Sequence, residues 1–286
     1  MPCFIGGDVN ICGMKWAAEA KENAKVPGIP YGIDITILSD PKTVLPFCVL
    51  NGTLITAMRT GATAGLFAKY TAPSGTDTVT SIGCGVVGRC TVMAIAETMP
   101  EVKKMYTADL DMSKAQDIIN EYQPKYPWLE LIPTTDTKAA AEKSQVIITQ
   151  TTATKEFIDE SWVAPGKSLV AVGAIEVDPE VVLKSDIVVV DEWNQMITNE
   201  SRPVAVGQPI LQHIGQGKRR KPVCLKNAGE HFRQLNSVIT AAEADQRFPR
   251  KFILRRGEQF SVKTVRFDTV SIILRYRHSP SFFSKF

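Results

Sequence analysis

One glycine-rich run in the sequence has the spacing of a dinucleotide-binding loop. Residues 83–88 read Gly-Cys-Gly-Val-Val-Gly, a GxGxxG pattern that lies between a candidate strand and a candidate helix. In such a loop Gly83 permits a tight turn, Gly85 lets a pyrophosphate approach the backbone, and Gly88 lets the helix pack on the strand. The N–H groups at the helix N-terminus then face the phosphates. We therefore predict a cofactor-binding loop that includes Gly83, Gly85, Val87 and Gly88.

An acidic residue stands where the ribose of such a cofactor requires one. Asp109 follows Gly88 by 21 residues, at the end of the next candidate strand. Its carboxylate would accept hydrogen bonds from the ribose hydroxyls and repel a 2′-phosphate, which favours NAD over NADP. Thr151 and Thr152 end the fourth candidate strand, where ligands of doubly wound sheets bind, and we expect their hydroxyls to contact the nicotinamide ribose. A tight turn in a sheet that binds no nucleotide is the alternative.

The elements that must position these residues follow from the hydrophobic pattern. From residue 78 onward, short apolar strands alternate with helices, which predicts a parallel sheet buried on both faces. The expected strands are residues 78–83, 103–109, 129–134, 144–152, 167–174 and 185–193, and the expected helices are residues 86–99, 113–123 and 137–144. We therefore predict an α/β fold with a Rossmann-type doubly wound sheet over residues 74–205.

The residues before this domain predict a hairpin and a helix. Apolar segments at 33–38 and 44–50 flank the turn sequence Ser-Asp-Pro-Lys-Thr. Small side chains at helical spacing within 54–69 predict close approach to a neighbouring backbone; they are Gly61, Ala62, Ala64, Gly65 and Ala68. We predict a second, smaller domain over residues 1–73, to which the C-terminal segment could contribute. Residues 206–286 form a basic segment for which no fold is predicted.

Composition narrows the class of protein. Of the 286 residues, 44% are apolar and 22% are charged, which is typical of a globular protein. No apolar run reaches the ~18 residues of a membrane span, and the first residues show no secretory signal. The six cysteines are scattered, which favours neither a disulfide scaffold nor a metal cluster. We expect a cytoplasmic protein without a metal or a membrane partner.

The net charge of +3 conceals a sharp partition. Residues 218–286 hold 16 of the 33 Lys and Arg but only five of the 30 Asp and Glu, so this segment carries +11 and residues 1–217 carry −8. Such asymmetry is typical of a nucleic-acid arm, of a surface for an acidic partner, or of a tail outside the fold. No nucleic-acid module is recognisable in the tail, so we do not expect nucleic acid as the partner.

Several motifs together resemble the ornithine cyclodeaminase/μ-crystallin family. They are Gly-Met-Lys-Trp at 13–16, the hairpin, Arg-Thr-Gly-Ala at 59–62, the glycine loop, and Thr-Thr-Ala-Thr at 151–154. The resemblance covers roughly residues 10–205. It implies an NAD(P)-dependent enzyme whose Rossmann domain faces a substrate and dimerisation domain, here residues 1–73, and a homodimer.

The resemblance also implies roles for individual residues. Lys15 matches the active-site lysine of the family and would hydrogen-bond the substrate carboxylate or imine. Arg59 matches the arginine of the Arg-Thr-Gly-Ala motif, whose guanidinium would clamp an α-carboxylate as a bidentate fork. Thr60 follows it and is implied near the cofactor phosphates. An exposed lysine and a structural salt bridge are the alternatives for Lys15 and Arg59.

Three departures from the family pattern affect the expected site. The family places a catalytic aspartate after a Gly-Gly pair, where this chain has Ile175. Glu176 or Asp178 could act as the general base instead, with a solvated turn as the alternative; we take Glu176 as the catalytic candidate. The family also carries a further N-terminal segment and a late glycine-rich turn, so we expect part of the substrate domain to be missing and residues 206–286 to be unmatched.

The expected activity is hydride transfer at the α-carbon of a small amino acid or its imine, with NAD as the cofactor. Cyclodeamination of ornithine to proline and ammonia is the alternative. A further alternative is a catalytically impaired family member that binds cofactor or a small ligand.

Overall fold

The computed structural model describes residues 2–173, 175–185, 187–190, 223–224 and 272–275. Nearly all of the basic segment 218–286, including Lys-Arg-Arg-Lys at 218–221, therefore lies outside the described residues, as does the predicted domain end at residue 205. The chain forms two compact units, and the boundary between them falls between Arg59 and Thr60. This boundary lies inside the helix α1 (Thr53–Thr71), whereas the boundary predicted at 73–74 lies just after that helix.

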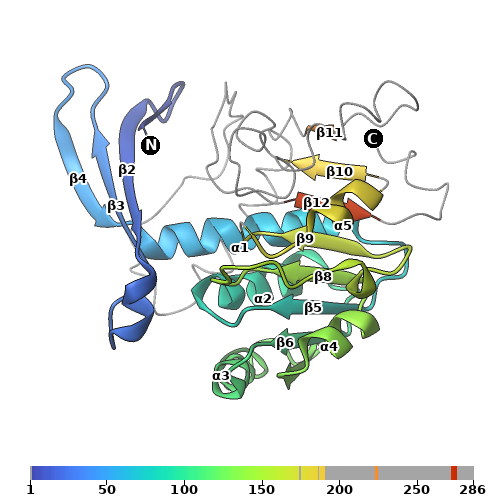
Figure 1. The fold of residues 1–286 in the computed structure, drawn as a ribbon. Coiled ribbons are helices and arrows are strands. Elements are labelled where there is room, and N and C mark those ends of the chain that lie inside the picture. Colours follow the sequence, from blue (N-terminus) through green and yellow to red (C-terminus); the bar gives the residue numbers. More distant parts are fainter. Residues whose placement is uncertain (1, 174, 186, 191–222, 225–271, 276–286) are drawn as a thin grey trace. The chain divides into compact units, whose positions relative to one another are not determined.

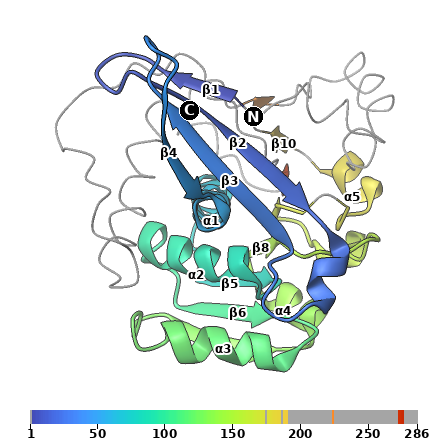
Figure 2. The same cartoon turned by 90° about the vertical axis from the view of Figure 1, so that its left-hand side faces the viewer.

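The first unit contains a four-stranded antiparallel sheet in the order β1-β2-β3-β4 (Figure 2). Its elements are β1 (Pro2–Ile5), β2 (Ile11–Glu19), the 3-10 helix η1 (Lys21–Lys25), β3 (Gly32–Ser39) and β4 (Pro46–Asn51). The predicted hairpin is confirmed as β3 and β4. Its turn is held by the Asp40 carboxylate, which accepts hydrogen bonds from the N–H groups of Lys42 and Thr43 at 2.8 and 2.7 Å.

The two faces of this sheet differ in character. Directly paired residues of antiparallel strands point to the same face. Lys15 pairs with Thr36 on one face, and Trp16 pairs with Ile35 on the other. The second face is apolar and exposed, with Trp16 67% and Val49 68% accessible to solvent. Further exposed side chains on it are Met14, Ile33 and Ile35.

The second unit contains a sheet in the order β11-β10-β12-β9-β8-β5-β6-β7 (Figure 1). Its strands are β5 (Thr78–Ile82), β6 (Lys104–Ala108), β7 (Glu130–Thr134), β8 (Val146–Thr149), β9 (Ser168–Ala171), β10 (Ile187–Val190), β11 (Val223–Cys224) and β12 (Ile272–Arg275). From β9 to β7 the pairs are all parallel, with the strand order of a Rossmann sheet. The predicted Rossmann-type fold is confirmed.

Strand β12 was not predicted, and it changes the neighbours of β10. It pairs antiparallel with both β9 and β10, so the sixth predicted strand joins the sheet but does not lie beside the fifth. The physical reason is that backbone pairing at a sheet edge accepts any extended segment. The apolar run Ile272–Leu274 supplies one from the part of the chain where no fold was expected.

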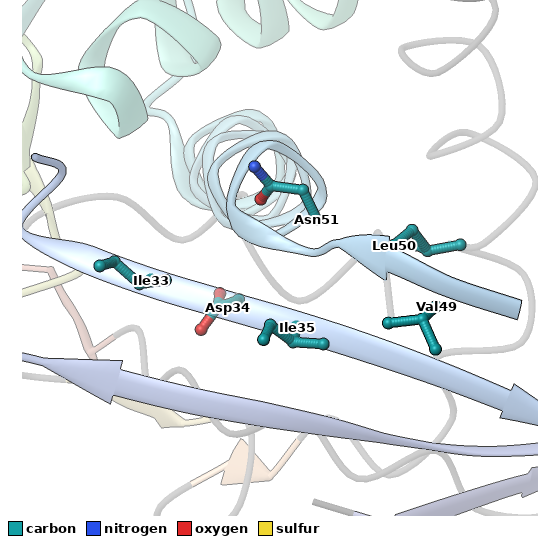
Figure 3. A pocket seen from close by; sticks show the side chains of 6 residues that line it. All are labelled: Ile33, Asp34, Ile35, Val49, Leu50 and Asn51. Carbon is teal, nitrogen blue, oxygen red and sulfur yellow. The ribbon is translucent and has the colours of Figure 1, made fainter. Parts of the chain in front are cut away.

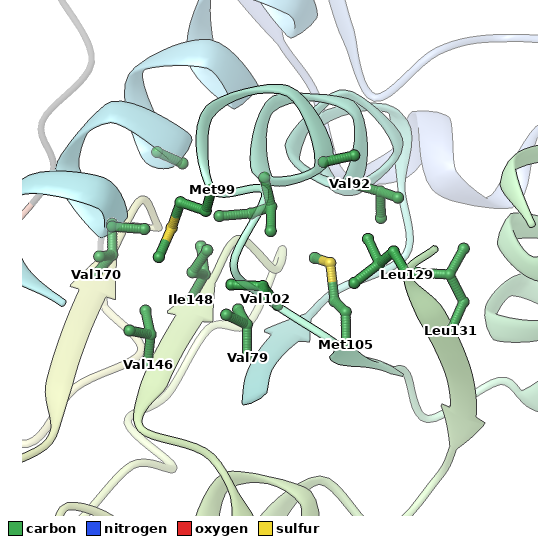
Figure 4. Close-up of a cluster of buried hydrophobic side chains, with 14 of the residues drawn as sticks. Val79, Val92, Met99, Val102, Met105, Leu129, Leu131, Val146, Ile148 and Val170 are labelled. Carbon is green, nitrogen blue, oxygen red and sulfur yellow. The ribbon is translucent and has the colours of Figure 1, made fainter. Parts of the chain in front are cut away.

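Helices cover both faces of this sheet, as a doubly wound fold requires. The helices after α1 are α2 (Val86–Thr98), α3 (Met112–Tyr122), α4 (Thr137–Lys143) and α5 (Pro179–Lys184), with a 3-10 helix η2 (Glu160–Trp162). On one face α1, α2 and α3 bury a core with the strands. Figure 4 shows Val92 of α2 and Met99, the C-cap residue of that helix, in the same cluster as Val79 and Met105. On the other face α4, η2 and α5 contribute to a second core.

Helices α1 and α2 approach each other at the backbone. A Cβ atom at Gly61 would lie 2.6 Å from the carbonyl carbon of Cys90, and one at Gly65 would lie 2.6 Å from the Cβ of Ala94. These glycines are therefore required by packing, which confirms the expectation drawn from the small residues of α1.

We predict that Gly61→Ala destabilises the protein. Alanine adds about 0.5–1 kcal/mol of helix propensity, but overpacking against a backbone costs about 1–3 kcal/mol, so the clash dominates. The expected net loss is roughly 1–2 kcal/mol, or a fall in Tm of about 2–4 °C per kcal/mol. Gly32→Ala is the matched control, because its nearest contact would be an ordinary 3.6 Å. Calorimetry that finds equal Tm values for the two variants would contradict the packing argument.

Candidate functional site

The glycine loop between β5 and α2 contains two glycines that the fold needs and one that it does not. Gly83 has φ +101°, and a Cβ there would lie 2.7 Å from the carbonyl oxygen of Gln150. A Cβ at Gly88 would lie 2.0 Å from the carbonyl oxygen of Gly83. At Gly85, in contrast, a Cβ would have no heavy atom within 4 Å. Gly85 therefore leaves open space over the loop, which suits a group bound from outside.

The N-terminus of α2 lacks the side-chain cap that three other helices have. Asp111, Asp136 and Asp178 cap α3, α4 and α5, and each carboxylate accepts a hydrogen bond from a backbone N–H of the first turn. At α2 the N-cap is Gly85, which has no side chain to do so. Uncapped N–H groups and the helix dipole together form an anion-binding site. The Asp178 carboxylate serves as a helix cap in this structure.

Asp109 holds the glycine loop from the end of β6. One carboxylate oxygen, Oδ2, accepts a hydrogen bond from the N–H of Cys84 at 2.8 Å, and Oδ1 accepts one from the N–H of Asp111 at 3.0 Å. A carboxylate has about four acceptor sites, so two backbone donors do not exhaust it. Asp109 thus lies beside the loop, as its spacing from Gly88 predicted, with capacity to accept further hydrogen bonds.

Gln150 supports the same loop, and sequence reasoning missed it. Its Oε1 accepts a hydrogen bond from the Thr91 hydroxyl of α2 at 2.7 Å, and its Nε2 bonds the Ser81 hydroxyl of β5 at 2.5 Å. The amide therefore ties the strand before the loop to the helix after it. A polar residue between Thr149 and Thr151 was the only available signal, and no local rule distinguishes it from an exposed glutamine.

The loop after β8 begins beside the glycine turn, since the carbonyl oxygen of Gln150 would lie 2.7 Å from a Cβ at Gly83. Thr151 is half-buried, and its N–H donates to the carboxylate of Glu176. Thr152 is exposed. Glu176 itself is only 1% exposed, which differs from the solvated turn considered as its alternative.

The two cysteines of the loop region are poor nucleophiles. Burial, and then the Asp109 carboxylate, raises the pKa of Cys84 to about 12. Burial raises the pKa of Cys90 to about 11, with Glu121 adding to the effect. Since the thiolate is the reactive form, both side chains are fillers of the core.

In the first unit, Lys15 lies on the polar face of the sheet. Its Nζ is 3.2 Å from the Thr56 hydroxyl of α1 and 3.7 Å from Oδ2 of Asp34, a carboxylate that is itself buried. Arg59 is one helical turn beyond Thr56, so it lies on the same side of α1. The two cationic residues singled out by the sequence therefore flank Thr56. Thr60, the next residue, is buried at 4% exposure.

A shallow pocket of about 310 Å³ lies between β3 and β4 of the same unit (Figure 3). Its lining is Ile33, Asp34, Ile35, Val49, Leu50 and Asn51. Asp34 is the one charged residue in this lining, and it is already engaged by Lys15. The pocket is largely apolar and offers no group suited to reaction chemistry.

A family model matches most of the chain and shows how it is related to known proteins. A model of the ornithine cyclodeaminase/mu-crystallin family matches residues 1–261. The chain belongs to this family. The sequence motifs indicated a resemblance over roughly residues 10–205. The match to the ornithine cyclodeaminase/mu-crystallin model extends beyond this range at both ends.

Two curated relatives are each 30% identical to this chain over the aligned residues. An N-((2S)-2-amino-2-carboxyethyl)-L-glutamate dehydrogenase from Staphylococcus aureus is 30% identical over 195 residues, which are 68% of this chain and 58% of that protein. An ornithine cyclodeaminase from Agrobacterium tumefaciens is 30% identical over 161 residues, which are 54% of this chain and 44% of that protein. The chain thus matches less than two thirds of the length of these relatives.

A solved family structure shares both sequence and fold. A Δ1-pyrroline-2-carboxylate reductase from Thermococcus litoralis, solved with NADH and L-proline, is 27% identical, with a TM-score of 0.59. The similarity covers 72% of this chain and 70% of the reductase. In the present chain, no helix among the described residues is long and apolar enough to cross a membrane. Nor do these residues include a group of three His, Cys, Asp or Glu side chains that could hold a metal ion.

Proposed function

We propose that this protein is an NAD-dependent oxidoreductase or cyclodeaminase that transfers a hydride at the α-carbon of a small amino acid or its imine. The observation that carries the proposal is the uncapped N-terminus of α2. It lies under open space at Gly85 and beside the Asp109 carboxylate. The relatives named above support the reaction class by their own names.

The residues of the second unit fit a dinucleotide. The N–H groups at the start of α2, at Val87 and Gly88, would bind the pyrophosphate, and Gly83 keeps the turn tight. Asp109 would accept hydrogen bonds from the adenosine ribose and disfavour a 2′-phosphate, hence NAD. Thr151 and Thr152 would contact the nicotinamide ribose, and Thr60 would lie near the phosphates. When bound, NAD would accept a hydride, and its reduced form would return one.

The residues of the first unit fit a substrate carboxylate. Arg59 would clamp the α-carboxylate as a bidentate fork, and Lys15 would donate a hydrogen bond to the carboxylate or imine. Thr56 and Asp34 hold Lys15 in place from two sides. Fixing the carboxylate fixes the α-carbon, from which the hydride leaves or to which it is added.

The three family outcomes differ in what accumulates. A dehydrogenase or imine reductase changes the amount of NADH. A cyclodeaminase releases ammonia and recycles its cofactor, so NADH does not accumulate. A cofactor-binding family member binds NAD without turnover of any substrate.

We predict that the purified protein binds NAD and turns over one class of amino acid or cyclic imine. The screen supplies NAD or NADH with ornithine, alanine and cyclic imines, and it follows NADH, ammonia and products together. Gly85→Asp should raise the Kd for NAD about 100-fold or more, because a carboxylate beside the pyrophosphate costs several kcal/mol.

The same variant controls for folding. An aspartate at the N-cap of α2 would supply the missing cap, worth about 1 kcal/mol, so its Tm should equal or exceed that of the wild type. Unchanged NAD affinity in calorimetry, with Tm preserved, would refute the dinucleotide site.

We also predict that Arg59→Ala raises KM for the amino-acid substrate by about 100-fold, since losing one partner of a desolvated charge pair costs about 2–5 kcal/mol. Arg59→Lys keeps the charge but loses the fork, so its KM should lie between the two. Steady-state kinetics at saturating NAD separate KM from cofactor binding. Equal KM values in all three proteins would remove Arg59 from the substrate site.

We further propose that the protein acts as a homodimer in the cytoplasm. The exposed apolar face around Trp16 and Val49 is the surface that a second copy would cover, since large apolar patches of this kind mark protein interfaces. The five cysteines whose side chains the structure describes are free thiols, which suits a reducing compartment.

The dimer is expected to depend on this face. Trp16→Glu should convert the dimer to a monomer, measured by analytical ultracentrifugation, because a buried unpaired charge at the centre of an interface is costly. Trp128→Glu makes the same change at another exposed tryptophan and should leave the mass unchanged. A Trp16→Glu protein with the wild-type mass would show that this face is not the interface.

A further inference from the structure

Glu176 is a carboxylate built into the interior of the second unit. It is 1% exposed, in the segment between β9 and α5. Its backbone carbonyl accepts hydrogen bonds from the N–H groups of Phe157 and Ile158, both at 3.0 Å. Ile158 also forms an isolated parallel bridge with Val177. These contacts fix the backbone of Glu176, so its side chain leaves from a well-defined position in the interior.

Two buried polar atoms at this place lack a well-formed hydrogen bond. Oε1 of Glu176 accepts one from the N–H of Thr151. Oε2 of Glu176 and the hydroxyl oxygen of Thr149 have no partner among the residues that the structure describes. The Thr149 hydroxyl is nevertheless close enough to influence the pKa of the carboxyl group. Buried polar atoms are rarely left unpaired, so the carboxyl group and the hydroxyl group are expected to share a hydrogen bond. Either group can supply its proton, because a hydroxyl is both a donor and an acceptor.

The charge balance favours a neutral carboxyl group. Burial raises the pKa of Glu176, and the hydrogen-bonding groups of Thr151, Thr149 and Gly173 offset part of that effect. No charged side chain of the described residues is among the groups that shift this pKa. A buried carboxyl group without a cation keeps its proton more readily than one in water.

We propose that Glu176 is a positioning residue that carries a proton on Oε2 and sets the loop after β8. In this arrangement Oε2–H donates to the Thr149 hydroxyl oxygen while Oε1 accepts from the N–H of Thr151. One acid group thus joins the last residue of β8 to the first threonine of the loop. The inference rests on the proposed function in one respect, since that loop is where we place the nicotinamide ribose.

The backbone beside Glu176 is shaped for this role. A Cβ at Gly173 would lie 2.2 Å from the carboxyl carbon of Glu176, so the acid group occupies the space that a side chain at Gly173 would take. The general-base role predicted for Glu176 requires an ionised carboxylate within reach of the substrate. Its burial and its two threonine partners favour positioning instead.

Replacement by glutamine distinguishes the two roles. Glu176→Gln keeps an acceptor for Thr151 and a donor for Thr149, so Kd for NAD and kcat of the holoenzyme should stay within about threefold. A general base would instead lose about 100-fold or more in kcat. Glu176→Ala removes both hydrogen bonds and should raise Kd for NAD, which the glutamine variant rescues. A Glu176→Gln protein with wild-type Kd but a collapsed kcat would overturn the proposal.

Infrared spectroscopy tests the proton without any cofactor. The wild type at pH 7 should show a protonated carboxylic-acid band that Glu176→Gln lacks, and absence of the band overturns the proposal even if NAD binds. Thr149→Val keeps the acid and deletes its acceptor, so the band should move to higher frequency; an unmoved band refutes the pairing. If NAD fails to bind the wild type, the proposed cofactor site fails, while the infrared result still decides the proton.

Discussion

The position of helix α2 is the constraint on which the rest of the second unit depends. It is held at backbone distance from two directions. Gly61 and Gly65 bring α1 against Cys90 and Ala94, and Gly88 brings the first turn of α2 against Gly83. Close-packed interiors tolerate no displacement at such contacts, because there is no flexible side chain to yield. The direction in which the N–H groups of the first turn of α2 point is therefore fixed by close contacts at glycines.

Polar side chains near the N-terminus of this helix also hold the glycine loop in place through hydrogen bonds. Asp109 and Gln150 reach the loop from the ends of β6 and β8 and form hydrogen bonds with its backbone and with nearby hydroxyl groups. Glu176 does the same for the next loop. Each of these residues follows a parallel strand at its carboxyl end, so a single edge of the sheet gathers them.

The sequence predicted the parts of the fold that local pattern encodes. Continuous apolar strands between helices identified the sheet from β5 to β9, and the Ser-Asp-Pro-Lys-Thr turn identified the hairpin of β3 and β4. Strand β2 was not predicted, because its residues show no strand pattern and form a strand only by pairing with β3. They include Gly13, Lys15 and two alanines. Strand β12 has an apolar run, but nothing local indicates that it pairs with β9 and β10, which are distant in the sequence. In the site, Gly83, Gly88 and Asp109 were recognisable from spacing, whereas Gln150 and the burial of Glu176 depend on contacts between distant segments.

The two sheets also differ in how far along the chain their partners lie. In the first unit every strand pairs with its neighbour in sequence, all within residues 2–51. In the second, β12 pairs with β9 across about a hundred residues of chain. Local contacts form faster than distant ones, so we expect the antiparallel sheet to fold first. Its apolar face would then be exposed before the parallel sheet is complete and before a second copy can cover it. Aggregation in that interval would compete with productive assembly. Slow pairing of β12 with β9 would thus limit the protein concentration at which the N-terminal sheet can fold without aggregating.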